Sequence, residues 1–433
     1  MTDRSYLCID LKSFYASVEC VERNLDPMTT NLVVADPERE RGTICLAITP
    51  AMKALGIRNR CRVFEIPPHV EYIMAPPRMQ LYIDYSVEIY GIYLKYISKD
   101  DIQVYSIDEA FLDVTDYLAL YGMDAFELGR CIMKDIKDTL GITATCGIGT
   151  NLYLAKIALD ITAKHSPDFI GYLDEELYRK TLWQHRPLTD FWRVGPGTAR
   201  RLASCGILTM EDIARADEKQ LYHLLGVDAE YLIDHAWGKE PVTIPEIKSY
   251  KAQSHSVSSG QVLMRDYNYE EGLLIIKEMA DLLTLDLVDN GLVTESLSLY
   301  VGYSKSLLPA ARGTVSMTVT TNSGKIILSH FVQLYKQIVN PAFAIRRVTL
   351  CCNNVVDEAY EQYDLFTDQK ALVRDRNLQK AVLEIKKKYG KNSILRGMNL
   401  EEGATTLERN LQIGGHKSGA TDTSRPGEAI RTF

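Results

Sequence analysis

Short apolar runs alternate with amphipathic stretches along the first 170 residues of the chain. Runs with the length and the Val, Ile and Thr content of buried strands occur at 5–10, 31–34, 104–115 and 143–149. Apolar residues at helical spacing predict helices over 12–23, 125–142 and 151–165. Gly141 is placed to end the second of these helices. The resulting β-α-β-β-α-β order predicts a ferredoxin-like sheet with its helices on one face.

The rest of the chain divides into further segments. Short helical patterns over 187–240 predict a small helical domain, and 241–250, with two prolines and little periodicity, indicates a linker. Residues 251–356 repeat the β-α-β-β-α-β order, so we expect a second small α+β domain. A basic helix follows in the segment 357–433, which ends in a tail that we expect to be flexible. The predicted fold class is therefore multidomain α+β.

Composition and charge narrow the classes of protein that fit. The 433 residues are 46% hydrophobic and hold no apolar run near the roughly 20 residues that span a bilayer, so we expect no membrane partner. Nine scattered cysteines without a C-x-x-C pair favour reduced thiols and a cytoplasmic location. The net charge of −8 argues against nucleic acid, but it is uneven, since residues 370–433 carry 13 basic and 7 acidic side chains. Charge alone leaves the partner open.

Three acids mark a candidate metal site. Asp10 ends the first predicted strand, and Asp108 and Glu109 interrupt the apolar segment at 104–115. Adjacent strand ends can bring three carboxylates together, and their mutual repulsion is relieved by a divalent cation. Hard oxygen ligands suit magnesium, and two such ions can serve an in-line phosphoryl displacement. The alternative is a solvated hairpin turn that happens to carry the Asp-Glu pair.

Two further motifs indicate nucleotide and DNA contacts. Tyr15 begins a helix beside the acids, where its ring can stand against a sugar and free backbone N–H groups can bind a triphosphate; ordinary core packing is the alternative. In the stretch 193–207, Val194, Gly195 and Gly197 open a helix that carries Arg200. Such a turn can bind a DNA phosphate as a helix-hairpin-helix does, or can simply join two helices.

These motifs, taken in order, resemble those of the Y-family of translesion DNA polymerases. The stretches that carry the resemblance are CIDLKSFYASVE, YSIDEAFLDVT and TCGIGTNLYLAKIALDITAKH, and the match covers about residues 1–350. Within the family the chain looks most like the Gram-positive relatives of the DNA polymerase V catalytic subunit. The resemblance implies a palm (1–11 and 79–170), fingers (12–78), a helix-hairpin-helix thumb (171–240), a linker (241–250) and a little finger (251–356).

The resemblance also implies roles for single residues. Asp10, Asp108 and Glu109 match the catalytic carboxylates that bind two Mg²⁺ ions, with the backbone carbonyl of Leu11 as a further ligand. Tyr15 matches the steric gate that rejects ribonucleotides.

Phe14 precedes the gate as it does in the family, and Lys164 matches a lysine that binds the triphosphate. The fingers depart from the family, because Pro50 and Lys53 stand where many members have a Tyr and an Arg. Lys53 can supply a point charge to the triphosphate but no bidentate fork.

The C-terminal part predicts further partners. Arg346 and Arg347, on the last strand of the second α+β domain, can contact the DNA backbone, although a solvated pair is the alternative. Gln362, Leu365 and Phe366 have the Q-x-x-L-F form of bacterial sliding-clamp ligands, in which a Gln bonds at a pocket rim and two apolar side chains become buried.

The function expected from the sequence is template-directed DNA synthesis opposite damaged template, as part of a DNA damage response. The expected partners are primer–template DNA, dNTPs, the sliding clamp, and accessory subunits or a recombinase filament, with the protein at the nucleoid when engaged. Two alternatives remain. A non-catalytic, clamp-associated repair scaffold would have lost a metal carboxylate, and a nucleotidyl cyclase would need neither the helix-hairpin-helix nor the clamp motif.

Overall fold

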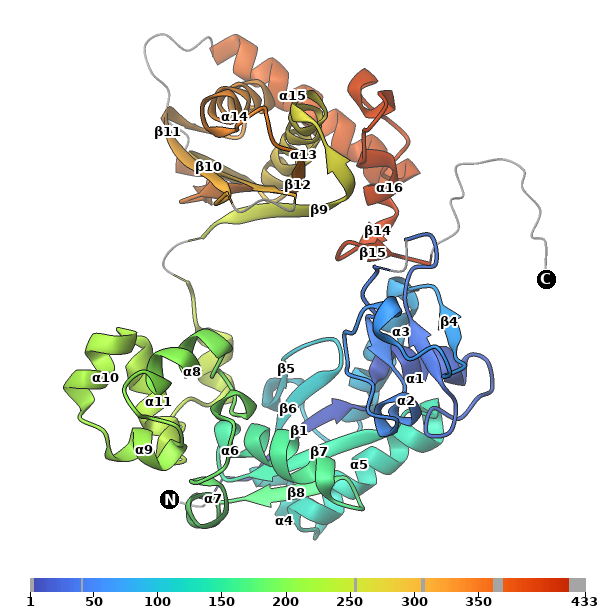
Figure 1. Ribbon diagram of the computed structural model, residues 1–433, viewed down its shortest axis with the longest axis vertical. Helices are drawn as coiled ribbons and strands as arrows, with labels where there is room; N and C mark the ends of the chain where they lie inside the picture. Colours follow the sequence, from blue (N-terminus) through green and yellow to red (C-terminus); the bar gives the residue numbers. More distant parts are fainter. Residues whose placement is uncertain (1–3, 40–41, 253–254, 305–307, 361–368, 420–433) are drawn as a thin grey trace. The chain divides into compact units, whose positions relative to one another are not determined.

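The computed structural model describes residues 4–39, 42–252, 255–304, 308–360 and 369–419. The chain forms two compact units, 1–250 and 251–433 (Figure 1). The division falls where we placed the start of the second α+β domain. Within the described ranges, every helix is too short or too polar to cross a membrane.

A five-stranded sheet forms the centre of the first unit. Its strands, in spatial order, are β5 (Ile102–Val104), β6 (Glu109–Asp113), β1 (Tyr6–Leu11), β7 (Ala144–Gly149) and β8 (Ile170–Leu173). The central strand β1 is antiparallel to both neighbours, whereas β8 is parallel to β7. The first four strands have the ferredoxin-like order, which confirms the predicted fold class. Strand β8 extends the palm sheet past residue 170, where we had ended the palm.

Helices cover both faces of this sheet, so the expectation of one covered face was wrong. Leu7 of β1 points toward α5 (Ala125–Leu140), which lies beside α3 (Met79–Tyr93). The next residue, Cys8, points the other way and packs with Leu152 of α6 (Leu152–Ile157). Helix α6 continues into a π-helical turn, η3 (Ala158–Thr162). Gly147 on β7 makes this second layer possible, since a Cβ there would lie 2.1 Å from the backbone oxygen of Ala155.

The segment 12–78, expected to form the fingers, contains a small sheet next to helix α1. Its strands, in spatial order, are β3 (Ala47–Ile48), β2 (Leu32–Val34) and β4 (Ile73–Ala75). Helix α1 (Phe14–Val21) packs against β2 and β3. Helix α2 (Pro50–Ala54) starts at a proline, which suits the first helical position because no N–H is needed there. The chain turns after α2 at Gly56, whose φ of +80° favours glycine.

Short helices follow the palm, as the sequence predicts. They are α7 (Glu175–Leu182), α8 (Pro196–Ala203), α9 (Met210–Arg215), α10 (Glu218–Leu225) and α11 (Asp228–Ala236). Their apolar sides share one core, which includes Leu202, Met210 and Leu232. Helix α4 (Thr115–Tyr121) lies earlier in the chain, between β6 and α5.

The predicted linker at 241–250 is a docked helix, which corrects the sequence interpretation. Helix α12 (Ile244–Ser249) begins with a Thr243–Glu246 capping box and tolerates its proline in the first turn. Ile244 is fully buried in the cluster that includes Cys8 of the palm. Lys248 donates to the backbone oxygen of Asp100 at 3.0 Å. Residues 241–250 are therefore part of the first unit, and α12 is the last helix of that unit.

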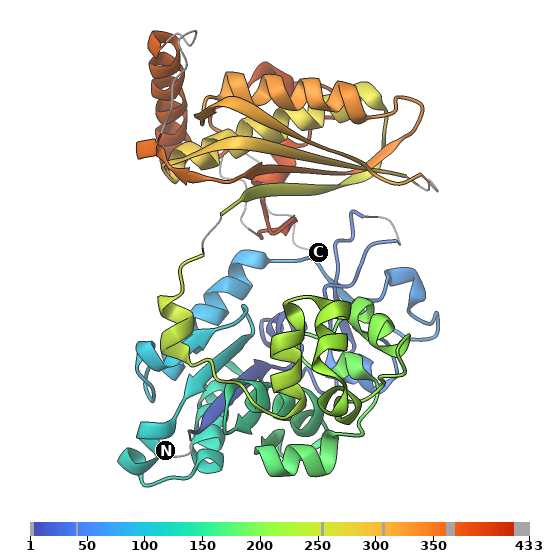
Figure 2. The same ribbon diagram turned by 90° about the vertical axis from the view of Figure 1, so that its left-hand side faces the viewer.

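The second unit repeats the element order of the palm with a different pairing. Its sheet has the spatial order β11 (Ala311–Thr321), β10 (Leu292–Tyr303), β12 (Ile345–Asn353) and β9 (Val257–Tyr267), and the short β13 (Val356–Asp357) pairs with β10. Helices α13 (Tyr269–Asp289) and α14 (Gly324–Ile338) lie together on one face (Figure 2). Their buried side chains form a single core with the sheet. The predicted second α+β domain is confirmed.

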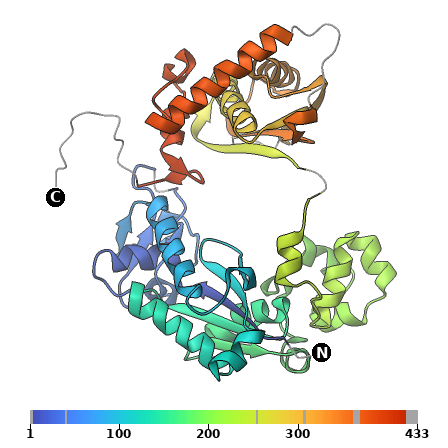
Figure 3. The ribbon, with the colours of Figure 1, turned by 180° about the vertical axis from the view of Figure 1, so that it is seen from behind.

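The basic helix after this domain runs alongside α13 and α14 as α15 (Gln369–Tyr389) (Figure 3). The following segment, expected to be flexible, is structured up to residue 419. It contains the 3₁₀ turn η7 (Gly397–Leu400), α16 (Thr406–Asn410) and a hairpin of β14 (Gln412–Ile413) and β15 (His416–Lys417). Composition missed this because the segment is held by polar contacts to α13 and β9 rather than by an apolar face of its own.

Glu278, a fully buried carboxylate on α13, is the main contact for this C-terminal segment. It accepts hydrogen bonds from the backbone N–H of Thr405 at 2.8 Å and from the side-chain amide of Asn399 at 2.9 Å. Arg409 adds a bond to Gln261 of β9 at 2.7 Å. The tail up to residue 419 is therefore part of the second unit.

Replacing Glu278 with alanine is expected to release the segment 396–418. Its buried donors would lose their acceptor, which costs about 1–3 kcal/mol. Limited proteolysis of the full chain should then cut between α15 and the C-terminus at least several times faster than in the wild type. Glu270→Ala, at an exposed position on the same helix, is the control. Wild-type protease resistance of the Glu278 variant would contradict the assignment.

Candidate active site

Strand pairing brings the three predicted carboxylates to one end of the palm sheet. Asp10 on β1 is directly opposite Glu109 on β6, so both side chains lie on the same face. The backbone N–H of Leu11 donates to the backbone oxygen of Asp108 at 2.9 Å, which ties the turn before β6 to the end of β1. The register of the β1–β6 ladder therefore determines which acids meet.

Asp10 shows the electrostatic cost of this arrangement. Burial, together with the charges of Asp108 and Glu109, raises the pKa of Asp10 to about 7, and the nearby charges of Lys164 and Lys156 limit the rise. A cation between the carboxylates would remove most of this cost.

Glu109 is turned toward a lysine that sequence reasoning missed. Its Oε2 accepts from Nζ of Lys156 at 2.9 Å, its Oε1 lies 3.3 Å from Sγ of Cys8, and both charged side chains are 9% exposed. Lys156 also pairs with Asp160 at 2.9 Å, and Asp160 pairs with Lys164 at the same distance. Glu109, Lys156, Asp160 and Lys164 thus form a row of alternating charges along α6 and the turns that follow it.

This geometry decides how well the site fits a metal. Within the described ranges, no three His, Cys, Asp or Glu side chains converge into a ready metal centre. Asp10 and Asp108 nevertheless offer hard oxygen donors of the kind that magnesium prefers. Burial and repulsion between the acids disfavour the ionised form of Asp10, and a cation would offset both effects. The donor chemistry therefore fits Mg²⁺, with Glu109 engaged by Lys156 in this structure.

Three lysines lie close enough to Asp10 to interact with its charge. Desolvation lowers the pKa of Lys53. The charge of Asp10 opposes this shift, and the charge of Lys164 adds to it. Desolvation likewise lowers the pKa of Lys12, and Lys53 and Lys164 lower it further. The predicted Lys53 and Lys164 thus lie together near Asp10, and Lys12 is a third cation that the motifs did not single out. A cluster of this kind suits a polyphosphate.

The start of α1 adds backbone donors beside these lysines. Ser13 precedes the helix in a left-handed conformation with φ of 52°, and its side chain makes no capping hydrogen bond. The side chain of Ser17 instead donates to the backbone oxygen of Lys12 at 2.6 Å. The first N–H groups of α1 therefore remain open to an anion, as predicted.

Tyr15 and Phe14 occupy this first turn of α1. Phe14 is buried at 2% exposure, so it belongs to the core, whereas Tyr15 is half-buried. Burial raises the pKa of Tyr15, and the charge of Asp108 raises it further. The ring of Tyr15 stacks on that of Tyr82 from α3, a residue that sequence reasoning missed.

The motif expected in the thumb has an open turn. The positions where a Cβ of Gly195 or Gly197 would point are empty to 4 Å, and Arg200 is exposed on the helix that follows. Val194, in contrast, is buried at 4% exposure in the thumb core. Its side chain cannot reach DNA, so the predicted contact at Val194 is limited to its backbone.

The two arginines predicted to contact DNA lie on strand β12 of the second unit. Arg347 and Arg312 both lie over the ring of Tyr300, at 5.7 and 5.2 Å from its centroid. Arg346 points differently and pairs with Asp266 at 3.6 Å. Of the two predicted arginines, Arg347 is the exposed one.

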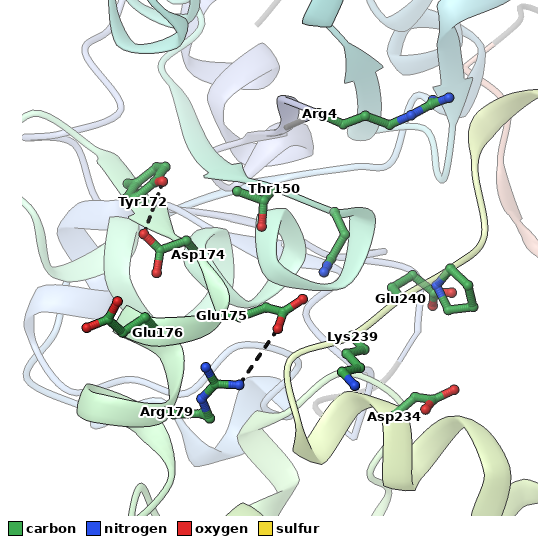
Figure 4. A pocket seen from close by; sticks show the side chains of 12 residues that line it. Arg4, Thr150, Tyr172, Asp174, Glu175, Glu176, Arg179, Asp234, Lys239 and Glu240 are labelled. Atoms are coloured by element: carbon green, nitrogen blue, oxygen red, sulfur yellow. Dashed lines mark hydrogen bonds and ion pairs between the residues drawn. The ribbon is translucent and has the colours of Figure 1, made fainter. Parts of the chain in front are cut away.

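Gln362, Leu365 and Phe366 fall outside the described residues. A hollow of about 660 Å³ lies between the end of the palm sheet and the thumb (Figure 4). Among its charged lining residues, Glu175 pairs with Arg179 at 3.7 Å and Glu240 with His235 at 3.0 Å. It shares no lining residue with the carboxylate site.

Comparisons with known proteins now define the class. The model of the impB/mucB/samB family matches residues 9–160, and the model of that family's C-terminal domain matches residues 254–365. The chain therefore belongs to the impB/mucB/samB family, which confirms the Y-family resemblance of its motifs.

Individual relatives match almost the whole chain. It is 30% identical to the "Putative UV-damage repair protein UvrX" of Bacillus subtilis (strain 168), over 96% of this chain and 98% of that protein. It is 28% identical to "DNA polymerase IV 2" of the same organism, over 96% and 99%. Among solved structures, a Y-family DNA polymerase chimera of Dbh and Dpo4 matches with a TM-score of 0.64 and 22% identity, covering 82% of this chain and 99% of that one. This last match concerns the fold.

Proposed function

We propose that the protein is a DNA-directed DNA polymerase that extends a primer opposite damaged template. The observation that carries the proposal is the meeting of Asp10, Asp108 and Glu109 at one sheet end, near Lys53 and Lys164. Acids that bind divalent cations beside cations that bind phosphate are the elements of phosphoryl transfer from a nucleotide. The family membership and the names of its relatives support the same reaction.

The residues of the site would divide the work as follows. Asp10, Asp108, Glu109 and the carbonyl of Leu11 would hold two Mg²⁺ ions, which supply positive charge at the reacting phosphate when bound. Lys53 and Lys164 would bind the triphosphate, together with the open N–H groups of α1. In that arrangement Lys164 would exchange Asp160 for a phosphate oxygen.

Tyr15 and the two DNA-binding regions would set the substrate. The ring of Tyr15 would stand where a ribose 2′-hydroxyl must go. Gly195, Gly197 and Arg200 of the thumb, and Arg347 with Arg346 of the second unit, would contact the DNA backbone without reading sequence. Such contacts suit a polymerase that must accept distorted template.

A primer-extension assay with the purified full chain tests this proposal. Extension of a primer on undamaged and UV-irradiated template is expected with dNTPs and Mg²⁺, and chelation of the metal should stop it. A folded protein that binds primer–template but adds no nucleotide under these conditions would contradict the polymerase assignment. It would favour the second candidate, a clamp-associated repair scaffold.

The clamp contact is a separate part of the proposal. Deleting 362–366 is expected to weaken binding to the bacterial sliding clamp by about a hundredfold, because the contact would bury Leu365 and Phe366. Surface plasmon resonance with immobilised clamp measures this loss, and primer extension without clamp serves as the control that should stay unchanged. Undiminished clamp binding by the deleted chain would remove the motif from the interface. We also propose accessory subunits or a recombinase filament as further partners, and a location at the nucleoid when the protein is engaged.

A further inference from the structure

The ring of Tyr15 is in contact with a second aromatic ring. It is stacked on the ring of Tyr82, with the centroids 4.5 Å apart and the planes 15° from parallel. Tyr82 lies on α3, which comes more than fifty residues after α1 in the sequence, and its side chain is fully buried. The half-buried gate residue therefore has a second aromatic ring directly behind it.

A buried network fixes the ring of Tyr82. Its hydroxyl donates to Oε1 of Glu19 at 2.8 Å. Glu19, at the other end of α1, is itself fully buried and accepts from Nε and Nη2 of Arg78 at 2.9 and 2.8 Å. Arg23 pairs with the same carboxylate. These hydrogen bonds satisfy the charge of Glu19 and lower its pKa, so the carboxylate remains ionised and its partners stay in place.

We propose that Tyr82 is a positioning residue for sugar selection, and that its ring holds Tyr15 in the orientation that excludes a 2′-hydroxyl. An aromatic side chain that projects from the first turn of a helix can rotate about χ1 and χ2 unless neighbours restrict it. Stacking on a ring that is itself anchored leaves Tyr15 no space to withdraw from an incoming ribonucleotide. The inference rests on the proposed function, because it specifies how the gate at Tyr15 works.

Variants of Tyr82 can distinguish a specific effect on the orientation of Tyr15 from a general loss of packing. Tyr82→Leu removes the stacked ring, whereas Tyr82→Phe keeps the ring and removes only the bond to Glu19. Tyr82→Met keeps most of the buried volume without a flat face, and serves if the leucine variant does not fold. Tyr85→Leu is the matched control, since Tyr85 lies on the same helix and bonds to Glu22 of the same partner segment at 2.8 Å without stacking on Tyr15.

The readout is the ratio of kcat/KM for dNTP to that for the matching rNTP, in single-nucleotide primer extension. Tyr82→Leu and Tyr82→Met are expected to lower this ratio about three- to tenfold, mainly through better use of the rNTP. Tyr85→Leu should stay within about twofold of the wild type, a range too small to reflect loss of a stacked pair. Tyr82→Phe keeps the stacked ring but loses the bond to Glu19, so its ratio should fall between those of Tyr82→Leu and the wild type.

The outcomes separate this inference from the assignment of the gate. If Tyr15→Ala lowers the ratio strongly but Tyr82→Leu and Tyr82→Met do not, the gate stands and the role of Tyr82 is refuted. If Tyr85→Leu lowers the ratio as much as Tyr82→Leu, the effect is one of general packing and the inference also fails. If Tyr15→Ala leaves the ratio unchanged, the gate itself is wrongly placed.

Discussion

Asp108→Ala is expected to lower the rate of primer extension on the order of a thousandfold, because one of the carboxylates proposed to hold the catalytic cations would be lost. Asp108 lies in the turn that Leu11 ties to β1, and its charge raises the pKa of Asp10. Its removal should leave the sheet intact, since among the described residues the Asp108 carboxylate bonds only to its near neighbour Ser106, at 2.6 Å. The loss should therefore be one of rate rather than of folding.

Two comparisons make this prediction sharp. Asp108→Asn keeps the size of the side chain and should be nearly as inactive, because the amide supplies no charge to a cation. Asp116→Ala, at an exposed position on α4, should extend primers at the wild-type rate. Thermal unfolding of all three variants should match the wild type within a few degrees. An Asp108→Ala protein with wild-type extension would mean that the reaction takes place elsewhere.

Gly147→Ala is expected to lower the free energy of unfolding by about 3 kcal/mol or more. A Cβ at this position would lie 2.1 Å from the oxygen of Ala155 and 2.3 Å from the nitrogen of Leu159, both of which are backbone atoms. Neither can move without displacing α6 and η3 from the sheet. The same displacement would shift Lys156 relative to Glu109, so activity should fall even at temperatures where the variant remains folded.

Gly91→Ala is the matched control for this effect. Gly91 lies near the end of α3, is exposed, and has no atom within 4 Å of the position of a Cβ. Its replacement should leave the protein as stable or up to about 1 kcal/mol more stable, since alanine favours helix. Urea unfolding of both variants gives the comparison. Equal midpoints for Gly147→Ala and the wild type would refute the close contact between α6 and the sheet.

The sequence predicted the site best where chemistry and periodicity coincide. The acids at 10, 108 and 109 interrupt strand patterns, and the structure pairs those strands as the argument required. What periodicity could not supply was the direction of each side chain. Lys156 looks like any lysine in an amphipathic stretch, and only the packing of α6 on the sheet turns it toward Glu109.

The misplaced segments share a physical cause. Residues 241–250 were taken for a linker because of their prolines, although a proline in the first turn starts a helix as readily as it ends one. The Gly, Thr and Ser content of the tail predicted a flexible segment, although one buried acid, Glu278, satisfies several of its donors. Both errors come from contacts between residues more than a hundred positions apart, which local composition does not encode.

The position of Asp10 on a central strand has a consequence for how such a site can change over time. Side chains alternate along β1, so an insertion or deletion of one residue before Asp10 would send its carboxylate to the α5 face. Hydrogen-bond ladders on both sides of β1 oppose any such slip. Mutations can therefore vary the lysines, the gate and the loops one at a time, whereas the acid at the end of β1 can be kept or lost but not gradually moved.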